Sequence, residues 1–397
     1  MDKKIYIKEK REKLGLTQKE FADALGLGKH GDRTLRRWEN GETSPSSIEL
    51  KYIQEFPEDP PFPNPPFEES KFLIADLFAG IGGIRLPFQE LGGYTVFTSE
   101  WDKFSQKTYR SNYGELPLGD ITQIHEEDIP DHNILIAGFP CQPFSQAGLK
   151  KGFEDMRGTL FFDIARIIAA KRPDAFLLEN VKQLRGHDKG RTLQKIKETL
   201  HDLDYTVHIE VLRAGDFGVP QNRERIYIVG FNNKIHSNVP FKFPSPTKEP
   251  TSVGNILEKG EVDEKYTISD KLYEGHLRRK EMHKQKGNGF GFSLFNENSP
   301  YTNTISARYY KDGSEILIDQ GPNKNPRKLT PRECARLQGF PEEFVISVSD
   351  TQAYRQFGNS VAVPVIRAIS KEMIVAMNKV NFLTDLKSLK QRELTLL

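Results

Sequence analysis

Residues 72–85 of the chain read "FLIADLFAGIGGIR". The apolar half predicts a buried strand, and Gly80, Gly82 and Gly83 predict a tight turn that leads into a helix. In α/β proteins such a turn lies at the carboxyl edge of the sheet, where ligands bind. The turn does not match the GxxxxGK(S/T) phosphate loop, and glycine turns are also common after strands that bind no ligand, so the turn alone leaves a ligand role open.

Four more short apolar segments follow this first strand, and helical segments such as "TLFFDIARIIAAK" and "TLQKIKETLHDL" separate them. The predicted strands are residues 94–100, 133–139, 175–180 and 225–231. This alternation predicts the α/β class, with a mostly parallel sheet that is covered by helices.

Composition divides the chain into five regions. Residues 1–55 read as short helices, and residues 56–70 hold a proline-rich stretch that predicts a semi-rigid linker. The α/β region covers residues 71–239, residues 240–326 form an irregular module without a sustained period, and the helical pattern returns over residues 327–397.

The overall composition excludes several classes of protein. The chain has 397 residues, a net charge of +2 and two cysteines without metal-ligand spacing, so neither a disulfide framework nor a zinc site is expected. The first residues, "MDKKIYIKEKREK", lack an apolar signal region, and no apolar run is long enough to cross a membrane, so we expect a cytoplasmic protein with no membrane partner.

The ends of the next predicted strands carry residues suited to a nucleoside. Glu100 can accept hydrogen bonds from ribose hydroxyl groups, Trp101 can cover an adenine, and Asp120 can bind the adenine amino group. A nucleoside-bearing cofactor is therefore expected, and a dinucleotide and S-adenosylmethionine both remain open at this level.

A second set of candidates surrounds the loop "GFPCQPFSQAG", residues 138–148. Cys141 lies between two prolines, which predicts an exposed loop, although an incidental loop cysteine would look the same. The strand "AFLLEN" brings Glu179 to the same sheet edge, and Arg223 and Arg225 begin another strand. A thiolate, a carboxyl group and two guanidinium groups suit attack on an electron-poor ring, unless the arginines only neutralise acidic neighbours.

Taken together, these motifs resemble those of the cytosine-C5 DNA methyltransferases of bacterial type II restriction–modification systems. The matching segments, in order, include "DLFAGIGGIR", "GFPCQPFSQAG", "LLENVKQL", "PQNRERIYIVGF", "RKLTPRECARLQGFP" and "QFGNSVAVPV". The resemblance implies a Rossmann-like methyltransferase domain with a smaller target-recognition domain. It makes Cys141 the nucleophile on C6 of a flipped cytosine, with Glu179 on N3 and Arg225 on O2; Arg223 supports them and Asn180 braces the loop.

The same resemblance implies S-adenosyl-L-methionine as the cofactor and no metal. The positions that match the family's cofactor contacts are Phe78, Gly80, Ile81, Gly83, Glu100, Trp101, Asp120, Ile121, Pro140, Leu160, Asn359 and Val361. The last two imply that the C-terminal region folds back onto the α/β domain.

The N-terminal region resembles the helix-turn-helix of phage-repressor-type regulators. Thr17 is placed to cap one helix, and "GDRTLRRWENG" is expected to be the recognition helix, with Arg33, Thr34, Arg36 and Arg37 facing DNA and Trp38 in the core. The expected partner is the promoter of the enzyme's own operon. The enzyme is expected to act as a monomer in catalysis, and a dimer at the promoter stays open.

The irregular module is expected to read double-stranded DNA. Between Lys265 and Arg332 there are 13 Lys and Arg against 7 Asp and Glu, an excess that suits a phosphate backbone. Further candidate DNA contacts are Ser145, Thr304, Ile305 and Arg308. Resemblance to bacterial enzymes of this kind implies a short palindrome of the CCGG, CCNGG or CCWGG type, with the inner cytosine methylated.

Three other functions fit parts of the sequence. An RNA cytosine-5 methyltransferase would share the Pro-Cys and Glu-Asn-Val elements, and a DNA-binding transcription regulator would need only the N-terminal helices. "NPPF", Asn64 to Phe67, matches a signature of enzymes that methylate exocyclic amines, but it lies in the proline-rich linker with no strand before it.

Overall fold

The computed structural model describes residues 3–379 except 26, 28, 29, 57, 141–159, 236–238, 248 and 289–290. Its contacts group the chain into two compact units. The first unit comprises Met1–Pro63, Lys103–Leu116 and Val253–Ser360, and the second comprises Asn64–Asp102, Pro117–Ser252 and Val361–Leu397. This grouping does not coincide with the five regions expected from composition.

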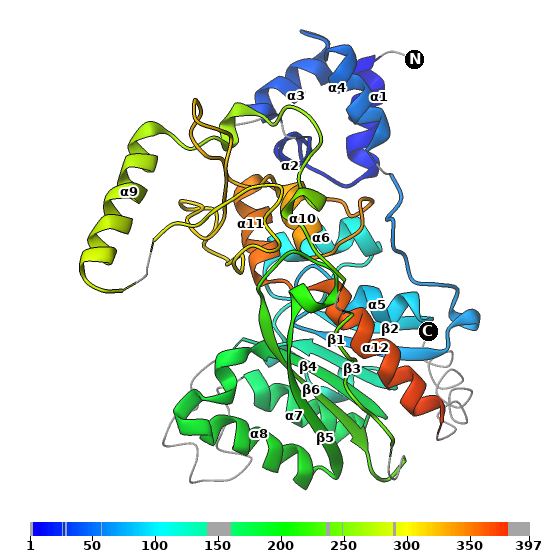
Figure 1. Ribbon diagram of the computed structural model, residues 1–397. Coiled ribbons are helices and arrows are strands. Elements are labelled where there is room, and N and C mark those ends of the chain that lie inside the picture. The colour runs from blue at the N-terminus through cyan, green and yellow to red at the C-terminus, as the bar shows by residue number, and fades with distance from the viewer. Residues whose placement is uncertain are drawn as a thin grey trace. The chain divides into compact units, whose positions relative to one another are not determined.

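The second unit is built on a six-stranded sheet with the order β2-β1-β3-β4-β6-β5 (Figure 1). The strands are β1 (Phe72–Leu77), β2 (Gly93–Ser99), β3 (Ile134–Gly138), β4 (Ala175–Val181), β5 (Tyr205–Arg213) and β6 (Glu224–Asn232). The first four are parallel to one another, whereas β6 runs antiparallel to β4 and β5 antiparallel to β6. The α/β fold class and all five expected strands are confirmed.

Strand β5 was not expected from the sequence. It is an edge strand whose residues are mostly only half-buried, so its sequence "YTVHIEVLR" lacks the continuous apolar run of the inner strands.

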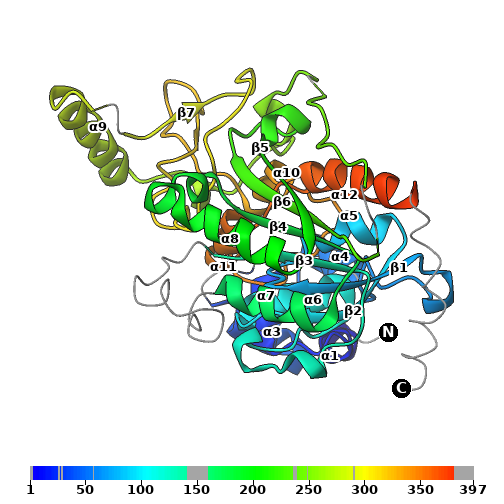
Figure 2. The ribbon, with the colours of Figure 1, turned by 90° about the horizontal axis from the view of Figure 1, so that it is seen from below.

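Helices cover both faces of this sheet. Successive side chains of a strand point to opposite sides, and the inner strands carry apolar residues on both sides, so both faces must be buried. On one face, α7 (Leu160–Lys171) and α8 (Arg191–Asp202) pack against residues such as Leu135 and Leu178. On the other face, α5 (Arg85–Glu90) and α12 (Val363–Asn378) pack against residues such as Ile134 and Leu177 (Figure 2). The resulting three layers hold the carboxyl ends of β1, β3 and β4 at one edge.

The first unit begins with four helices, α1 (Lys3–Lys13), α2 (Gln18–Ala24), α3 (Gly31–Asn40) and α4 (Ser47–Glu55). Their shared core includes Ile7, Phe21, Leu35 and Trp38. Helix α2 begins directly after Thr17, at the position expected for a capping residue.

The rest of the first unit contains α6 (Lys103–Tyr113), α9 (Asp270–Gln285), α10 (Pro331–Leu337) and α11 (Asp350–Asn359), with the short strands β7 (Leu294–Phe295) and β8 (Leu317–Ile318). The expected linker is anchored here: the Phe62 N–H donates to the Asn112 carbonyl at 2.8 Å, and its ring stacks on Phe344. Helix α9 was missed from the sequence because it buries only His276 and so shows no apolar stripe.

No helix in the described part of the chain is long and apolar enough to span a membrane.

Candidate active site

A carboxyl group and a guanidinium group meet at the carboxyl end of β4. Glu179 is 7% exposed, and its Oε1 lies 3.1 Å from Nε of Arg225 at the start of β6. The pairing of the two strands sets this contact, since Val181 is opposite Arg225 and Glu179 is opposite Tyr227. Arg223, two residues earlier, is 2% exposed. The structure thus brings together three of the expected catalytic residues.

Burial dominates the electrostatics of this group. Desolvation raises the pKa of Glu179 more than the Arg225 and Arg223 guanidinium groups lower it. Burial, reinforced by the neighbouring charge of Arg225, lowers the pKa of Arg223 to about 9. A carboxyl group with a raised pKa can hold or give a proton closer to neutral pH than an ordinary glutamate, which suits work on a ring nitrogen.

The base of the cysteine loop lies beside Glu179. Gly138 ends β3 opposite Glu179, and a methyl group on it would lie 3.7 Å from Glu179 Oε2. Asn180 Nδ2 donates to the Phe139 carbonyl at 2.8 Å, and its Oδ1 accepts from the Val181 N–H at 2.8 Å. Asn180 therefore holds the main chain two residues before Cys141. Cys141 and Ser145 lie outside the described residues.

The other cysteine is placed where it cannot react. Cys334 lies in α10 with 0% exposure, and burial raises the pKa of its thiol well above the ordinary value. A buried neutral thiol is neither accessible nor nucleophilic.

The glycine turn after β1 forms the second half of the site. Phe78, Gly80 and Gly82 have φ of 55°, 57° and 81°, a backbone that favours glycine. The Gly80 N–H donates to Glu100 Oε2 at 2.8 Å, and Glu100 Oε1 accepts from the Asp102 N–H at 2.7 Å. Burial raises the pKa of Glu100 despite these hydrogen bonds.

Two features leave room for a ligand at this turn. Among the described residues other than its two chain neighbours, none has an atom within 4 Å of the position that a Cβ on Gly80 would take, and Trp101 is 77% exposed. An open glycine turn, a held carboxylate and an exposed indole fit a nucleoside with a ribose and a purine.

The remaining expected cofactor residues are distributed over both units. Asp120 is exposed and its carboxylate accepts from the Thr122 N–H at 3.0 Å, while Pro140 is also exposed. Leu160 begins α7 and is half-buried. Side chains that are at most 5% exposed belong to Ile81, Ile121 and Val361, and Gly83 is buried as well. All of these belong to the second unit, whereas Asn359, at the end of α11, belongs to the first.

Helix α3 presents the expected DNA-facing residues. Arg33, Arg36 and Arg37 are exposed and Thr34 is half-buried. Trp38 is 4% exposed, which confirms that it lies in the core. The helix ends at Gly41 in a left-handed conformation.

The expected DNA contacts of the irregular module differ in exposure. Arg308 is exposed and Thr304 is half-buried, but Ile305 is 0% exposed and can reach DNA only through its main chain. Gly358 of α11 was missed by sequence reasoning: a Cβ on it would overlap the main-chain carbonyl of Ser306. A glycine inside a helix with no turn to make was the available signal.

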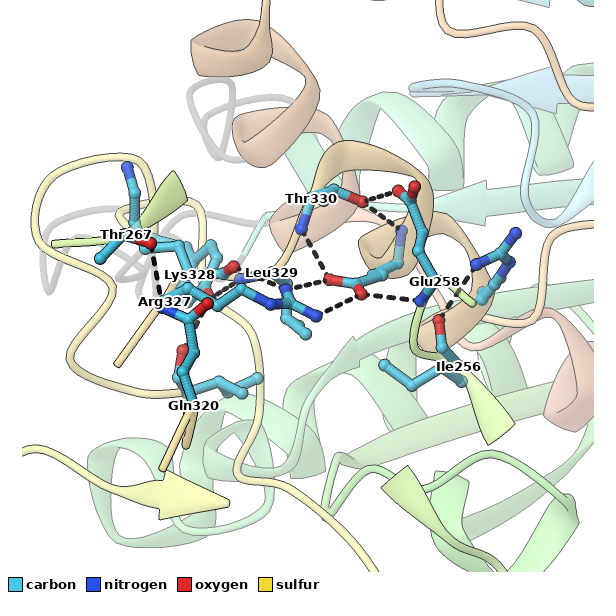
Figure 3. A network of polar contacts seen from close by, with 12 residues as sticks. Ile256, Glu258, Thr267, Gln320, Arg327, Lys328, Leu329 and Thr330 are labelled. Carbon is cyan, nitrogen blue, oxygen red and sulfur yellow. Dashed lines mark hydrogen bonds and ion pairs between the residues drawn. The ribbon is translucent and has the colours of Figure 1, made fainter. Parts of the chain in front are cut away.

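A buried polar network holds the segments around this module (Figure 3). Arg327 Nη1 and Nη2 donate to the two carboxylate oxygens of Glu333 at 2.7 and 2.8 Å. Glu333 also accepts the N–H groups of Glu258 and Thr330, both at 2.9 Å. Since Glu333 has 0% exposure, these four hydrogen bonds satisfy a buried carboxylate, and the one from the Glu258 N–H ties Glu258 to the start of α10.

Among the described residues, no group of three or more His, Cys, Asp or Glu side chains could hold a metal ion.

Comparison with known proteins decides the family. Residues 72–375 match the model of the C-5 cytosine-specific DNA methylases. The chain belongs to this family. Residues 7–56 match a helix-turn-helix model, so this DNA methylase carries a helix-turn-helix domain at its N-terminus.

The relatives extend over nearly the whole methylase. It is 66% identical over 374 residues to the type II methyltransferase M.SsoII of Shigella sonnei, covering 94% of this chain and 98% of that one. It is 63% identical to M1.ScrFI of Lactococcus lactis subsp. cremoris, covering 94% and 96%. The expected enzyme class, a type II cytosine-C5 DNA methyltransferase, is confirmed, and the alternatives of an RNA enzyme or a regulator without activity are not supported.

Solved structures confirm the fold. A DNMT2 variant of Spodoptera frugiperda superposes with a TM-score of 0.62 at 22% identity, covering 77% of this chain and 99% of that one.

Proposed function

We propose that this DNA methyltransferase transfers a methyl group to C5 of a cytosine that is flipped out of duplex DNA, through a covalent bond from Cys141 to C6. The observation that carries the proposal is the pair of buried Glu179 and half-buried Arg225 beside Gly138, where the chain that leads to Cys141 begins. The buried state of Cys334 leaves Cys141 as the available thiol of the two in the chain. A base inside a duplex is out of reach of such groups, so it must leave the stack.

The proposed roles follow from the charges of these residues. The Cys141 thiolate adds to C6, Glu179 holds N3 and the exocyclic amine as negative charge moves into the ring, and Arg225 donates to O2. Arg223 supports the same site by its positive charge, and Asn180 holds the loop. After C5 takes the methyl group, its proton leaves, the bond to C6 breaks, and the Cys141 thiolate is released.

S-Adenosyl-L-methionine is the proposed cofactor, and when bound it supplies the electrophilic methyl group. The exposed Trp101, the open space at Gly80 and the carboxylate of Glu100 suit its adenosine moiety.

The proposed target is a short palindrome of the CCGG, CCNGG or CCWGG type with the inner cytosine methylated, and the proposed reader is the basic module with Thr304 and Arg308. Its excess of Lys and Arg supports contact with phosphates. Bisulfite sequencing of plasmid from cells that express the enzyme tests this: dominant methylation outside this group of sites refutes the target and leaves the enzyme class standing.

The proposed second function is repression of the enzyme's own operon through the N-terminal domain. The exposed arginines on α3 support it, because side chains on this helix enter the major groove in helix-turn-helix proteins. Changing Arg33, Arg36 and Arg37 to Ala leaves the core residues Leu35 and Trp38 in place. The triple variant is expected to lose a specific promoter shift and keep methylation, whereas Lys8→Ala on α1 keeps both; a promoter shift that survives the triple change contradicts this role.

One assay tests the proposed chemistry. Labelled S-adenosylmethionine is incubated with the enzyme and duplex DNA, tRNA or no nucleic acid, and label is expected only in duplex DNA, on C5 of cytosine. Label in tRNA or in the protein alone would overturn the proposal. The proposed place of action is the cytoplasm, where the DNA of bacteria such as those of the named relatives lies.

A further inference from the structure

Asn64 of the proline-rich stretch is bound to the edge of the catalytic sheet. Its Nδ2 donates to the Thr95 carbonyl at 3.0 Å, and its Oδ1 accepts from the Thr95 N–H at 2.9 Å. One side-chain amide thus pairs with both main-chain groups of a residue in β2, as a neighbouring strand would. The amide of this "NPPF" segment is therefore engaged with the protein itself.

The same oxygen of Asn64 binds a buried arginine. Arg85 Nη2 donates to Asn64 Oδ1 at 2.9 Å, and Arg85 Nε donates to Gln89 Oε1 at 2.8 Å. Arg85 has 0% exposure and is the first residue of α5, two residues after Gly83. A buried guanidinium group requires such acceptors, so the position of Asn64 and the start of α5 depend on each other.

Both segments that Asn64 contacts lead into the site at the carboxyl edge. The β2 strand that contains Thr95 ends at Ser99 and delivers Glu100 and Trp101. The glycine turn that precedes Arg85 donates from Gly80 to Glu100. Hydrogen bonds and two short chain segments therefore form a closed ring. Asn64 bonds to Thr95 and Arg85, Gly80 bonds to Glu100, and residues 80–85 and 95–100 connect these contacts along the chain.

We propose that Asn64 is a positioning residue for the cofactor site, which sets the glycine turn and the Glu100–Trp101 segment relative to each other without touching the ligand. This inference rests on the proposed use of S-adenosylmethionine. Truncation of Asn64 leaves the N–H and carbonyl of Thr95 and the Arg85 guanidinium with one partner fewer each, so β2 and the turn can shift apart. The expected consequence is a weaker cofactor site in a protein that still folds.

The test compares three variants of the full-length enzyme. Asn64→Ala removes all three hydrogen bonds, and Asn64→Asp keeps the acceptor for Thr95 and Arg85 but loses the donor. Asn133→Ala is the matched control: Asn133 also joins segments of this sheet, accepting from the Leu73 N–H at 2.9 Å, but at the amino end of the strands. The dissociation constant of S-adenosylmethionine is measured by calorimetry, together with Tm, the cofactor KM and kcat.

Asn64→Ala is expected to raise the cofactor Kd and KM about 10-fold with kcat at saturating cofactor changed less than about twofold, because only part of the free energy of the three lost hydrogen bonds is coupled to the cofactor site. Asn64→Asp is expected to restore part of the affinity. Asn133→Ala is expected to lower Tm by a similar amount and leave the cofactor Kd unchanged.

The outcomes separate the positioning role of Asn64 from the proposed use of S-adenosylmethionine. If Asn64→Ala lowers Tm like Asn133→Ala but keeps the wild-type cofactor Kd, Asn64 is only structural and the inference is wrong. Equal losses of cofactor affinity in both variants would also overturn it, since the effect would then come from general destabilisation. Failure of the wild-type enzyme to bind S-adenosylmethionine would instead refute the proposed cofactor.

Discussion

At the residue scale, the proposed methyl transfer depends on a carboxyl group that is desolvated and still contacts a guanidinium group. Glu179 is nearly buried, yet Arg225 lies within 3.1 Å and Gly138 leaves its other oxygen close to the base of the cysteine loop. The types of these residues at strand ends could be predicted from the sequence. Their distances could not, because they depend on the antiparallel β4–β6 register, which no local pattern encodes.

Replacing Glu179 by Gln tests its role. The amide keeps the size of the side chain but cannot exchange a proton with N3, so kcat is expected to fall about 10²-fold or more. Cofactor affinity should stay within about twofold, because the ion pair of Glu179 is with Arg225 of β6 and the hydrogen bond that holds the glycine turn is made by Glu100. Glu224→Gln is the control, since Glu224 lies between Arg223 and Arg225 in the sequence and its carboxylate pairs with exposed Lys182. Equal activity of the two variants contradicts the assignment.

At the element scale, the sequence predicted what is buried and missed what is exposed. The inner strands and α7 have continuous or periodic apolar residues, which is why they could be recognised. Strand β5 lies at the sheet edge and α9 buries one residue, so neither carries such a pattern. The close approach of Gly358 to Ser306 joins residues far apart in the chain, and a single sequence contains no record of it.

Gly358→Ala tests whether α11 positions the segment that contains Thr304 and Arg308. A methyl group would collide with the Ser306 main chain, so the segment must move, at a cost of about 1–3 kcal/mol in unfolding free energy. We expect weaker binding of the specific duplex in a gel-shift assay and nearly unchanged cofactor affinity. In the part of the chain that the structure describes, a Cβ at Gly275 would meet nothing within 4 Å outside the backbone of α9 itself, so Gly275→Ala should be neutral or slightly stabilising. Wild-type duplex affinity of Gly358→Ala would show that α11 does not position the segment.

At the scale of the whole molecule, composition and packing divide the chain differently. The proline-rich stretch reads as a boundary, but Phe62 is packed in the first unit and Asn64 is bound in the second. Residues 103–116 and 253–360 join the N-terminal helices in one unit although other regions separate them in the sequence. Composition reports which segments can form a core, whereas contacts across long sequence distances decide which segments share one.

The stability of the fold is expected to fall in mild acid partly through His132. Its Nδ1 lies 2.8 Å from the Pro130 carbonyl, and burial lowers its pKa from 6.5 to about 4. Below about pH 6.5 the imidazole takes up a proton in the unfolded state but stays neutral in the folded state. The contribution of His132 to the free energy of unfolding is therefore highest above pH 6.5 and falls as the pH falls toward 4. Between pH 7.5 and pH 5 the loss is about 2 kcal/mol.

Urea unfolding of His132→Gln at both pH values measures this contribution. The variant should show a pH dependence smaller by about 2 kcal/mol than the wild type, and His201→Gln, at an exposed position in α8, should match the wild type. An unchanged pH dependence in His132→Gln would contradict the assignment to this histidine.

The proposed covalent mechanism is tested most directly by trapping its intermediate. A duplex with 5-fluorocytosine at the inner cytosine of the target is incubated with the enzyme and S-adenosylmethionine, then resolved on a denaturing gel and mapped by peptide mass spectrometry. Fluorine cannot leave as a proton does, so we predict a stable adduct on Cys141, which is absent from Cys141→Ser. No adduct with the wild-type enzyme, or an adduct on the buried Cys334, would contradict the account.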